Sequence, residues 1–266
     1  MKHTATKEHY DIVILGAGNV AEAFARTLAR RREVSVRQIF ARNSVRGRAV
    51  ADIADAAWSD NAAELAAADI YIIAVSDRAI AEVASLPFPD GAIVVHTAGS
   101  VPMSAIPARN GRRGILYALQ SFSQGRDIAL DDVPIFIEGD SEDCVAELVA
   151  FAELISSRVA LADSRRRREI HLAGVFVNNF TNHLYAIGAE LMEREGLSFD
   201  ILKPLILESA AKAVASDNPH SVQTGPAIRH DRAVVESHLD MLANDKLKQQ
   251  IYNDLTNSIW ETSKKI

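Results

Sequence analysis

The feature that most constrains the fold is a short apolar segment followed at once by two glycines and an alanine at fixed spacing. Residues 11–15 are typical of a buried strand, and they lead into Gly16-x-Gly18-x-x-Ala21. The first glycine permits a tight turn, the second lets a ligand approach the backbone, and the alanine lets the next helix pack closely. Free N–H groups at the start of that helix can bind phosphate. We expect the pyrophosphate of a dinucleotide to lie against Gly16, Gly18, Asn19, Val20 and Ala21.

Periodicity divides the chain into two parts. Up to residue 163, apolar segments typical of strands alternate with Ala-rich helical segments, whereas after residue 163 only a 3.6-residue period remains. This pattern predicts an α/β domain with a Rossmann-type parallel sheet at 1–163 and an all-α domain at 164–266. The expected strands are 11–15, 34–41, 69–75, 92–97, 115–119 and 133–138. The expected helices are 20–32, 44–57, 77–85, 141–157, 164–195, 199–216, 231–243 and 245–263.

Composition excludes several classes of protein. The 266 residues are 48% hydrophobic and 24% charged, as in globular proteins, and a net charge of −6 gives no general basic surface for nucleic acid. The single cysteine, Cys144, and a polar N-terminus without an apolar core favour a cytoplasmic protein. The chain lacks the G-K-[ST] motif of P-loops, the G-x-S-x-G elbow and the Tyr-x-x-x-Lys pair of short-chain dehydrogenases. It also lacks an H-E-x-x-H helix, and one cysteine gives no Cys-rich cluster, so no metal site is expected.

The end of the second expected strand indicates which dinucleotide binds. NAD-binding folds carry a carboxylate there for the ribose 2′-hydroxyl, whereas a 2′-phosphate requires cationic donors. This chain has Arg42-Asn43-Ser44 with Arg46 and Arg48 nearby, and no carboxylate in that stretch. An arginine can hold a phosphate with two parallel hydrogen bonds. We therefore expect NADP, held by Arg42, Asn43 and Ser44, although an ordinary surface arginine at this position is the alternative.

A run from His171 to Ala189 contains no Asp, Glu, Lys or Arg. It is about as long as a membrane span, but its histidines and asparagines are too polar for lipid, so no membrane partner is expected. At about 100° per residue, Arg167, His171, Asn178, Asn182 and Tyr185 form one polar stripe. The stripe predicts a cleft or an intersubunit interface, with satisfied polar groups inside a helical bundle as the alternative. The four arginines at 165–168 are predicted to form a solvated first turn.

Six segments carry a resemblance to a known family. The sequence resembles the superfamily of β-hydroxyacid dehydrogenases, 6-phosphogluconate dehydrogenase, pyrroline-5-carboxylate reductase and ketopantoate reductase. It is more similar still to a bacterial family of NADP oxidoreductases that joins a Rossmann-like domain to a helical domain of unknown function. The segments are GAGNVA at 16–21, FARNS at 40–44, ADIYIIAVSDRAI at 68–80, HTAGSVP at 96–102, HLAGVFVNNFTNHLY at 171–185 and TGPAIRHD at 224–231.

The resemblance implies further site residues. The loop after the third strand of the superfamily borders the cofactor, which implies Val75, Ser76 and Asp77 as cofactor neighbours. The loop after the fourth strand lies beside the nicotinamide and the substrate, which implies roles for Thr97 and Ser100, although both could equally be turn formers. Among the remaining candidates for substrate binding are two on the charge-free run, Asn179 and Tyr185, and two at the Gly-Pro turn near residue 226, Arg229 and His230. A capping turn is the alternative for the last pair.

The resemblance also exposes a departure from the superfamily. Related dehydrogenases carry a catalytic lysine followed four residues later by an asparagine on the first long helix of the second domain. Asn182 matches that asparagine, but Asn178 stands in place of the lysine, and an amide cannot act as a general acid. His171 lies two turns earlier, and an imidazole is the side chain best suited to exchange protons near neutral pH. We expect His171 to donate the proton while Asn178 and Asn182 orient the substrate.

Together these features predict a homodimer, paired through the helical domain, that transfers hydride between NADP(H) and a small carbonyl, imine or hydroxy acid in the interdomain cleft. The loss of the lysine leaves two alternatives. One is an NADP-binding sensor or partner protein without catalytic activity. The other is a reductase that exchanges hydride between NADP and a flavin or deazaflavin.

Overall fold

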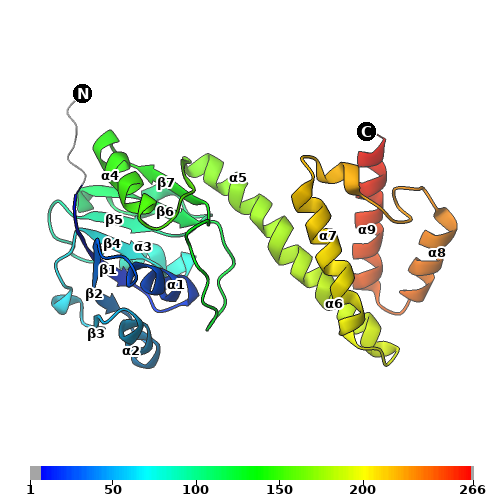
Figure 1. Ribbon diagram of the computed structural model, residues 1–266, viewed down its shortest axis with the longest axis horizontal. Coiled ribbons are helices and arrows are strands. Elements are labelled where there is room, and N and C mark those ends of the chain that lie inside the picture. The colour runs from blue at the N-terminus through cyan, green and yellow to red at the C-terminus, as the bar shows by residue number, and fades with distance from the viewer. Residues whose placement is uncertain (1–6, 265–266) are drawn as a thin grey trace. The chain divides into compact units, whose positions relative to one another are not determined.

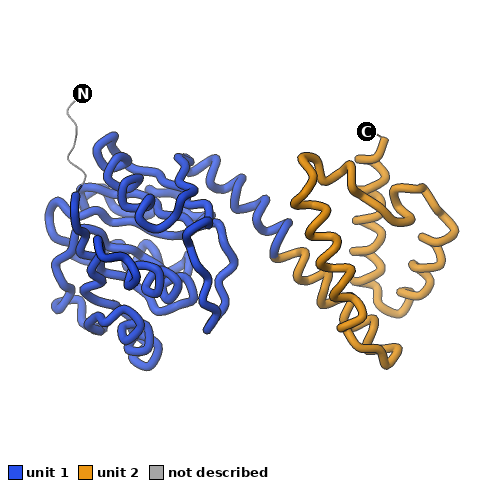
Figure 2. The backbone as a smooth tube through the Cα atoms, viewed as in Figure 1, with its two compact units in different colours: residues 1–178 blue, residues 179–266 orange. Residues whose placement is uncertain are grey.

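A computed structural model of the chain describes residues 7–264, so residues 1–6 of the N-terminus discussed above lie outside it. The chain divides into two compact units, residues 1–178 and 179–266 (Figure 2). The helical region begins with α5 (Ser164–Gly174), where the change in periodicity predicted it. This first helix belongs to the first unit, so the division between the units comes later in the chain than residue 163.

The first unit is built on one sheet of eight strands in the order β3-β2-β1-β4-β5-β6-β7-β8 (Figure 1). All neighbouring strands run parallel except β6 and β7, which are antiparallel. The sheet therefore confirms the Rossmann-like α/β fold, with its topological switch point between β1 and β4. The strands are β1 (Tyr10–Leu15), β2 (Val34–Phe40), β3 (Ala57–Ser59), β4 (Ile70–Ile73), β5 (Ile93–His96), β6 (Arg112–Ala118), β7 (Ile135–Gly139) and β8 (Val159–Leu161).

The core lies on both faces of the sheet. In β1, Ile12 and Ile14 pack into one cluster of buried side chains with Phe24, whereas Val13 and Leu15 pack into a second cluster. This alternation follows from the two-residue period of a strand. Because both faces are covered, the central strands are continuously apolar in sequence, which is the pattern that made them recognisable.

Four helices connect the strands of this unit: α1 (Asn19–Leu28), α2 (Ser44–Ile53), α3 (Ile80–Val83) and α4 (Glu142–Glu153). The predicted helix at 44–57 is wrong at its C-terminal end. The chain leaves α2 after Ile53, takes a left-handed conformation at Asp55 with φ of 49°, and enters the edge strand β3. The predicted helix at 77–85 is a 3₁₀ turn at Asp77–Ala79 followed by one turn of α-helix.

The predicted helix at 164–195 is interrupted. A π-helical segment, Val175–Phe180, separates α5 from α6 (Thr181–Arg194). A π turn holds more residues than an α turn, so the phase calculated at 100° per residue is lost across it. The polar stripe predicted from Arg167 to Tyr185 is wrong in that respect. The solvated turn at 165–168 is also only partly correct, because Arg167 is completely buried while the other three arginines are exposed.

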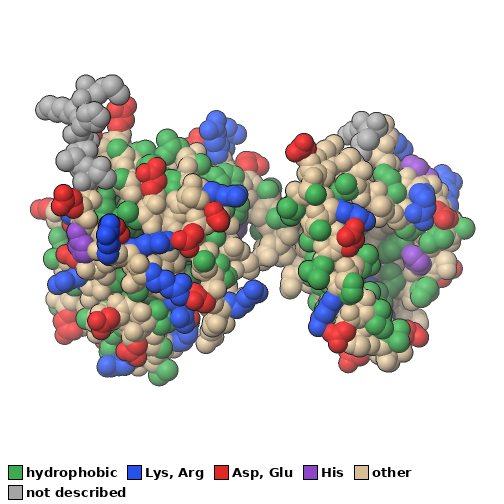
Figure 3. All heavy atoms as spheres, viewed as in Figure 1, with side chains coloured by type: hydrophobic (Ala, Val, Ile, Leu, Met, Phe, Trp, Pro, Cys, Tyr) green, Lys and Arg blue, Asp and Glu red, His purple; other side chains and the backbone are tan. Residues whose placement is uncertain are grey.

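The second unit contains α6, α7 (Lys203–Ala215), α8 (Arg232–Met241) and α9 (Lys246–Ser263), which confirms its mostly helical character. Its surface carries many large apolar side chains, and Figure 3 shows several of them on the face in view. Leu205 is 61% exposed and Leu207 71%. Within residues 7–264, no helix has both the length and the apolar character needed to cross a bilayer.

Candidate functional site

The turn after β1 has the geometry that the glycine pattern predicts. Gly16 has φ of 127°, and a Cβ atom at this position would lie 2.2 Å from the carbonyl oxygen of Ala74. Its N–H donates to the carbonyl oxygen of Phe40, so the turn is fixed to the ends of both neighbouring strands. Only glycine satisfies this combination of backbone angle and close contact.

The start of α1 fits a pyrophosphate. The N-cap residue Gly18 is exposed and has no side chain to cap the helix, so N–H groups of the first turn are available to a ligand. Apart from Gly18 itself and its two chain neighbours, no residue has a heavy atom within 4 Å of the position that a Cβ of Gly18 would occupy, so a ligand has free access to the backbone there. The Asn19 amide is engaged elsewhere, because it donates to the carbonyl oxygen of Phe122.

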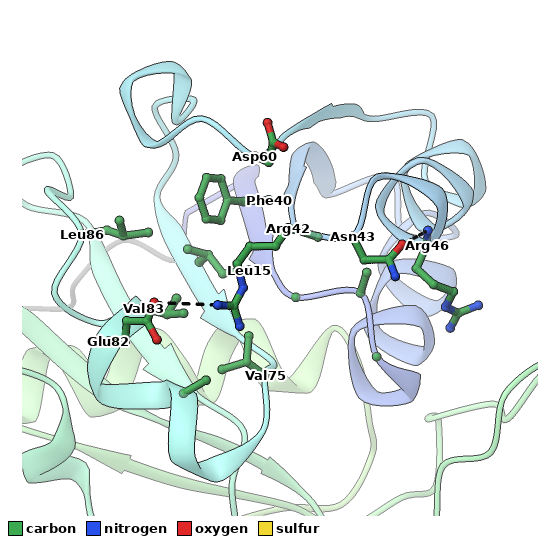
Figure 4. Close-up of a pocket in the computed structure, with 15 residues that line it drawn as sticks. Leu15, Phe40, Arg42, Asn43, Arg46, Asp60, Val75, Glu82, Val83 and Leu86 are labelled. Atoms are coloured by element: carbon green, nitrogen blue, oxygen red, sulfur yellow. Dashed lines mark hydrogen bonds and ion pairs between the residues drawn. The ribbon is translucent and has the colours of Figure 1, made fainter.

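A pocket of about 490 Å³ opens beside this turn (Figure 4). Its volume lies in the range of small-molecule and cofactor sites. It lies at the carboxyl ends of β1, β2 and β4, where open α/β sheets bind ligands. The lining includes five of the predicted cofactor residues, namely Gly16, Gly18, Arg42, Asn43 and Val75. Sequence reasoning missed the apolar wall formed by Phe40, Val83 and Leu86, and it missed Asp60 and Glu82.

The basic residues near β2 differ in availability. Arg42 is 82% exposed on the pocket wall, with a guanidinium nitrogen 4.0 Å from a carboxylate oxygen of Glu82 (Figure 4). Arg46 is instead paired with the buried Glu22, at 2.9 Å, and Arg48 stacks on the ring of Trp58 at 4.3 Å. Burial raises the pKa of Glu22, but hydrogen bonds from Arg26 and Arg46 outweigh it and leave that pKa below its ordinary value. Arg46 also lines the pocket, but Glu22 binds its guanidinium, so Arg42 is the more exposed arginine of the pocket, at 82% against 30%.

Two other predicted phosphate ligands, Asn43 and Ser44, lie at the start of α2. The side-chain oxygen of Asn43 accepts from the backbone N–H of Arg46 at 3.0 Å and so caps this helix. Its amide N–H groups remain available as donors. Ser44 is the first residue of α2 and is exposed.

The loops after β4 and β5 are tied together. The Ser100 hydroxyl donates to the carboxylate of Asp77, and the backbone N–H of Thr97 donates to the carbonyl oxygen of Ile73. Val75 lines the pocket, whereas Ser76 and Asp77 are exposed at the start of the following 3₁₀ turn. Five predicted residues, Val75, Ser76, Asp77, Thr97 and Ser100, therefore lie in two adjoining loops at one edge of the sheet.

A buried ion pair joins α5 to the sheet. The guanidinium of Arg167 donates to the carboxylate of Glu138 in β7 and to the carbonyl oxygen of Val101 in the loop after β5. Ser164 donates to both oxygens of the same carboxylate, at 3.0 and 2.9 Å. The contacts hold the first turn of α5 against β7 and against the loop beyond β5.

One turn later on α5, the side chain of His171 contacts strand β6 of the sheet. Its Nδ1 atom lies 3.1 Å from the hydroxyl of Tyr117, which is buried at the end of β6. A Cβ atom at Gly99 would lie 2.6 Å from Nδ1 of His171, so the loop after β5 packs directly against this imidazole. The structure thus brings His171 together with the loop that contains Thr97 and Ser100. Sequence reasoning missed Tyr117, whose place at a strand end was the available signal.

The other predicted substrate residues do not gather around His171 within the first unit. Asn178 is exposed at the end of that unit, and Asn179, Asn182 and Tyr185 belong to the second. Tyr185 lines an apolar pocket of about 220 Å³ between α6 and α7. Arg229 is exposed, while His230 has φ of 54° and stacks on Trp260 at 5.6 Å between ring centroids.

The histidine at the end of β5 makes stability depend on pH. His96 has no exposed surface, and burial is the main reason why its pKa is lowered to about 4. An unfolded histidine titrates near pH 6.5. Neutral His96 therefore stabilises the fold fully above pH 6.5, and this contribution is lost as the pH falls toward 4. We expect the free energy of unfolding to drop by about 2 kcal/mol between pH 7 and pH 5 because of this residue.

Chemical denaturation at the two pH values measures this effect. The His96→Gln variant is expected to lose most of the difference, whereas His9→Gln, a change at an exposed histidine of the same unit, is expected to keep it. An equal pH dependence in wild type and His96→Gln would contradict the assignment.

Comparisons with known proteins agree with this geometry. Residues 11–99 match a family described as NADP oxidoreductase coenzyme F420-dependent, and residues 133–259 match a domain of unknown function, DUF2520. A structure titled "putative NADP oxidoreductase" from Bacteroides fragilis is 40% identical, with 96% of this chain and 99% of that chain covered and a TM-score of 0.89. No curated protein matches the chain significantly.

Two more distant structures share the fold. One is 1-pyrroline-5-carboxylate reductase from Streptococcus pyogenes, at 12% identity and a TM-score of 0.62, covering 97% of this chain and 100% of that chain. Another is an imine reductase from Myxococcus stipitatus in complex with NADP⁺, at 13% identity and a TM-score of 0.58, covering 96% and 93%.

The fold and the pocket define a Rossmann-type dinucleotide-binding protein with a helical C-terminal region. With 40% identity over nearly its whole length, the chain belongs to the family of the Bacteroides fragilis protein. This membership confirms the family resemblance found in the sequence.

Proposed function

We propose that this protein is an oxidoreductase that binds NADP(H) in the pocket beside Gly16 and Gly18 and reduces a small carbonyl or imine, or oxidises the corresponding alcohol or amine. The observation that carries the proposal is the junction of an open helix N-terminus, a glycine-lined pocket and the exposed Arg42. The nicotinamide of NADP(H) supplies or accepts the hydride when it is bound. The family description as NADP oxidoreductases supports the same reading.

The protein's own residues have two tasks in this proposal. Gly16, Gly18 and the first turn of α1 hold the pyrophosphate, and Arg42 with Asn43 and Ser44 binds the 2′-phosphate. On the substrate side, the carbon of the C=O or C=N group receives the hydride, and His171 supplies a proton from Nε2 to the oxygen or nitrogen of that group. In that step an Nε2–H bond breaks and an O–H or N–H bond forms on the substrate.

Arg42 is expected to select NADPH over NADH. The Arg42→Ala substitution should raise the Kd for NADPH about 10- to 100-fold, because a hydrogen bond between charged groups contributes roughly 1.5–3 kcal/mol. The Kd for NADH, which has no 2′-phosphate, should change less than about twofold. Fluorescence titration with both nucleotides measures the two constants.

Arg48→Ala is the matched control, because Arg48 lies six residues further along the chain, on α2, but stacks on Trp58 and does not line the pocket. It should bind NADPH as the wild type does. An equal loss of NADPH and NADH affinity in Arg42→Ala would show that Arg42 does not read the 2′-phosphate.

A second candidate function is hydride exchange between NADP(H) and a deazaflavin coenzyme. It is favoured by the match of residues 11–99 to a family described as coenzyme F420-dependent. It also agrees with Asn178 in the place of a catalytic lysine, because no side chain of the protein need donate a proton in such an exchange. His171→Gln separates the candidates: it should slow carbonyl or imine reduction at least 10-fold and leave deazaflavin reduction unchanged.

We also propose that two copies of the chain pair through the helical unit. Among its described residues the buried apolar side chains are Ala227, Val235 and Leu242, a small core for a unit of this length. The exposed apolar residues of α6 and α7, which include Leu184, Leu191, Leu205 and Leu207, offer the surface that a second copy would cover. Light scattering should give twice the mass of the chain, and a monomer at micromolar concentration would contradict this pairing.

A further inference from the structure

We propose that Tyr117 is a positioning residue for His171: its hydroxyl holds Nδ1 of the imidazole and so leaves Nε2 as the nitrogen offered to substrate. The two side chains come from β6 and α5, which lie far apart in the sequence. The hydroxyl oxygen and Nδ1 are 3.1 Å apart, and the ring centroids are 6.1 Å apart with planes inclined at 67°. The proposal rests on the proposed function, because that function gives Nε2 its task.

The surroundings keep this pair in one geometry. Tyr117 is buried and stacks on Phe136 in β7, with ring planes inclined at 29°. Behind it, the Gly99 backbone comes so close that an added Cβ would lie 2.8 Å from Cζ of Tyr117 and 2.6 Å from Nδ1 of His171. Arg167, one turn before His171, ties α5 to Glu138 and Val101. Because helix and strand are both fixed, the hydroxyl and the imidazole stay within hydrogen-bond distance.

The hydroxyl suits both protonation states of the imidazole. A phenol can donate to Nδ1 of a neutral ring, and its oxygen can accept from Nδ1–H of an imidazolium. Among residues 7–264, His171 is the side chain that the Tyr117 hydroxyl contacts by hydrogen bond, and Nε2 of His171 has no such partner. The neutral ring is therefore expected to carry its proton on Nε2.

Tyr117 orients the imidazole but does not supply the proton. Burial raises the pKa of Tyr117, although Arg167 acts in the opposite direction, so the phenol holds its proton tightly. If the phenol gave up this proton, a buried tyrosinate would remain, which is costly in an apolar setting. The proton that reaches the substrate comes from Nε2 of His171, and it is replaced from solvent.

The test uses Tyr117→Phe, which removes the hydroxyl and keeps the ring. Nitrogen-15 NMR of the histidine side chains in the nucleotide-free protein reports which ring nitrogen of His171 is protonated. In the wild type, neutral His171 is expected to show one tautomer, with the proton on Nε2 and a hydrogen-bonded Nδ1. In Tyr117→Phe we expect the Nδ1 resonance to shift and a mixture of tautomers to appear. An unchanged His171 spectrum would overturn the proposal.

Tyr10→Phe is the matched control, because the Tyr10 hydroxyl is also buried but has no hydrogen-bond partner among the described residues. It should leave the His171 spectrum unchanged. Gly99→Ala is a second variant, expected to disturb the same resonances because its methyl group would collide with the pair.

Turnover separates failure of this inference from failure of the proposed function. With an accepted carbonyl or imine, Tyr117→Phe should lower kcat about 10-fold and leave KM within about twofold, as expected when a reacting group is misoriented. If NMR shows the tautomer change but His171→Gln reduces the substrate at the wild-type rate, the role of His171 as proton donor in the proposed function fails, and the Tyr117 hydroxyl only fixes the tautomer of the imidazole. If kcat falls in His171→Gln but not in Tyr117→Phe, the positioning role is refuted.

Discussion

Replacing Arg167 with methionine is expected to lower the free energy of unfolding of the first unit by about 3 kcal/mol or more. Methionine has a similar length but no charge, so the Glu138 carboxylate and the Val101 carbonyl lose the donor that pairs with them. Breaking a buried ion pair by removal of one partner typically costs roughly 3–5 kcal/mol. Glu138 keeps some exposure and its bonds from Ser164, so the lower end of that range is expected.

Chemical denaturation followed by tryptophan fluorescence measures this change. Arg166→Met is the control, since its side chain is exposed in the same turn and substitutions of that kind usually change stability by less than about 0.5 kcal/mol. A loss below 1 kcal/mol in Arg167→Met would mean that the ion pair does not anchor α5 to the sheet.

Gly16→Ala is expected to damage both folding and nucleotide binding. The φ angle of 127° is unfavourable for any residue with a Cβ, and the new methyl carbon would lie 2.2 Å from the carbonyl oxygen of Ala74. Either the turn or the end of β4 must move. We expect a loss of about 3 kcal/mol in the free energy of unfolding and at least 100-fold weaker NADPH binding.

Two other glycines separate the causes of this effect. Gly111 also has a positive φ, 74°, but open space around its Cβ position, so Gly111→Ala should show only a backbone cost of about 1 kcal/mol. Gly18 has open space and φ of −79°, so Gly18→Ala should fold normally while its methyl group obstructs the pyrophosphate. Wild-type NADPH affinity in both Gly16→Ala and Gly18→Ala would contradict the assigned role of the turn.

Most of the fold was predictable because its signals are local. The turn at Gly16 depends on backbone freedom at one residue, and the central strands are apolar because both faces are buried. β3 was missed because its three residues follow an Ala-rich helical segment and are paired with β2 only in the folded sheet. The π-helical segment at 175–180 was missed because an apolar period assumes a regular α-helix.

The site was predictable to a smaller extent, because its chemistry depends on pairings between distant residues. Arg42 and Arg46 look alike in sequence and both line the pocket, but Arg46 is paired with the buried Glu22 on another helix while Arg42 is far more exposed. The position of Arg167 in a run of four arginines predicts a side chain that faces solvent. The side chain is buried instead, because the carboxylate of Glu138 in β7 pairs with it in the interior. Tyr117 becomes a candidate only when β6 and α5 are brought together.

The measurement that tests the central claim most directly is a titration of the intact protein with NADPH and with NADH at equal ionic strength, followed by nucleotide fluorescence. The account predicts saturable binding of NADPH at micromolar concentration, with an affinity at least 10-fold higher than that of NADH. No binding of either nucleotide at millimolar concentration would contradict the assignment of the pocket, and tighter binding of NADH would contradict the role of Arg42.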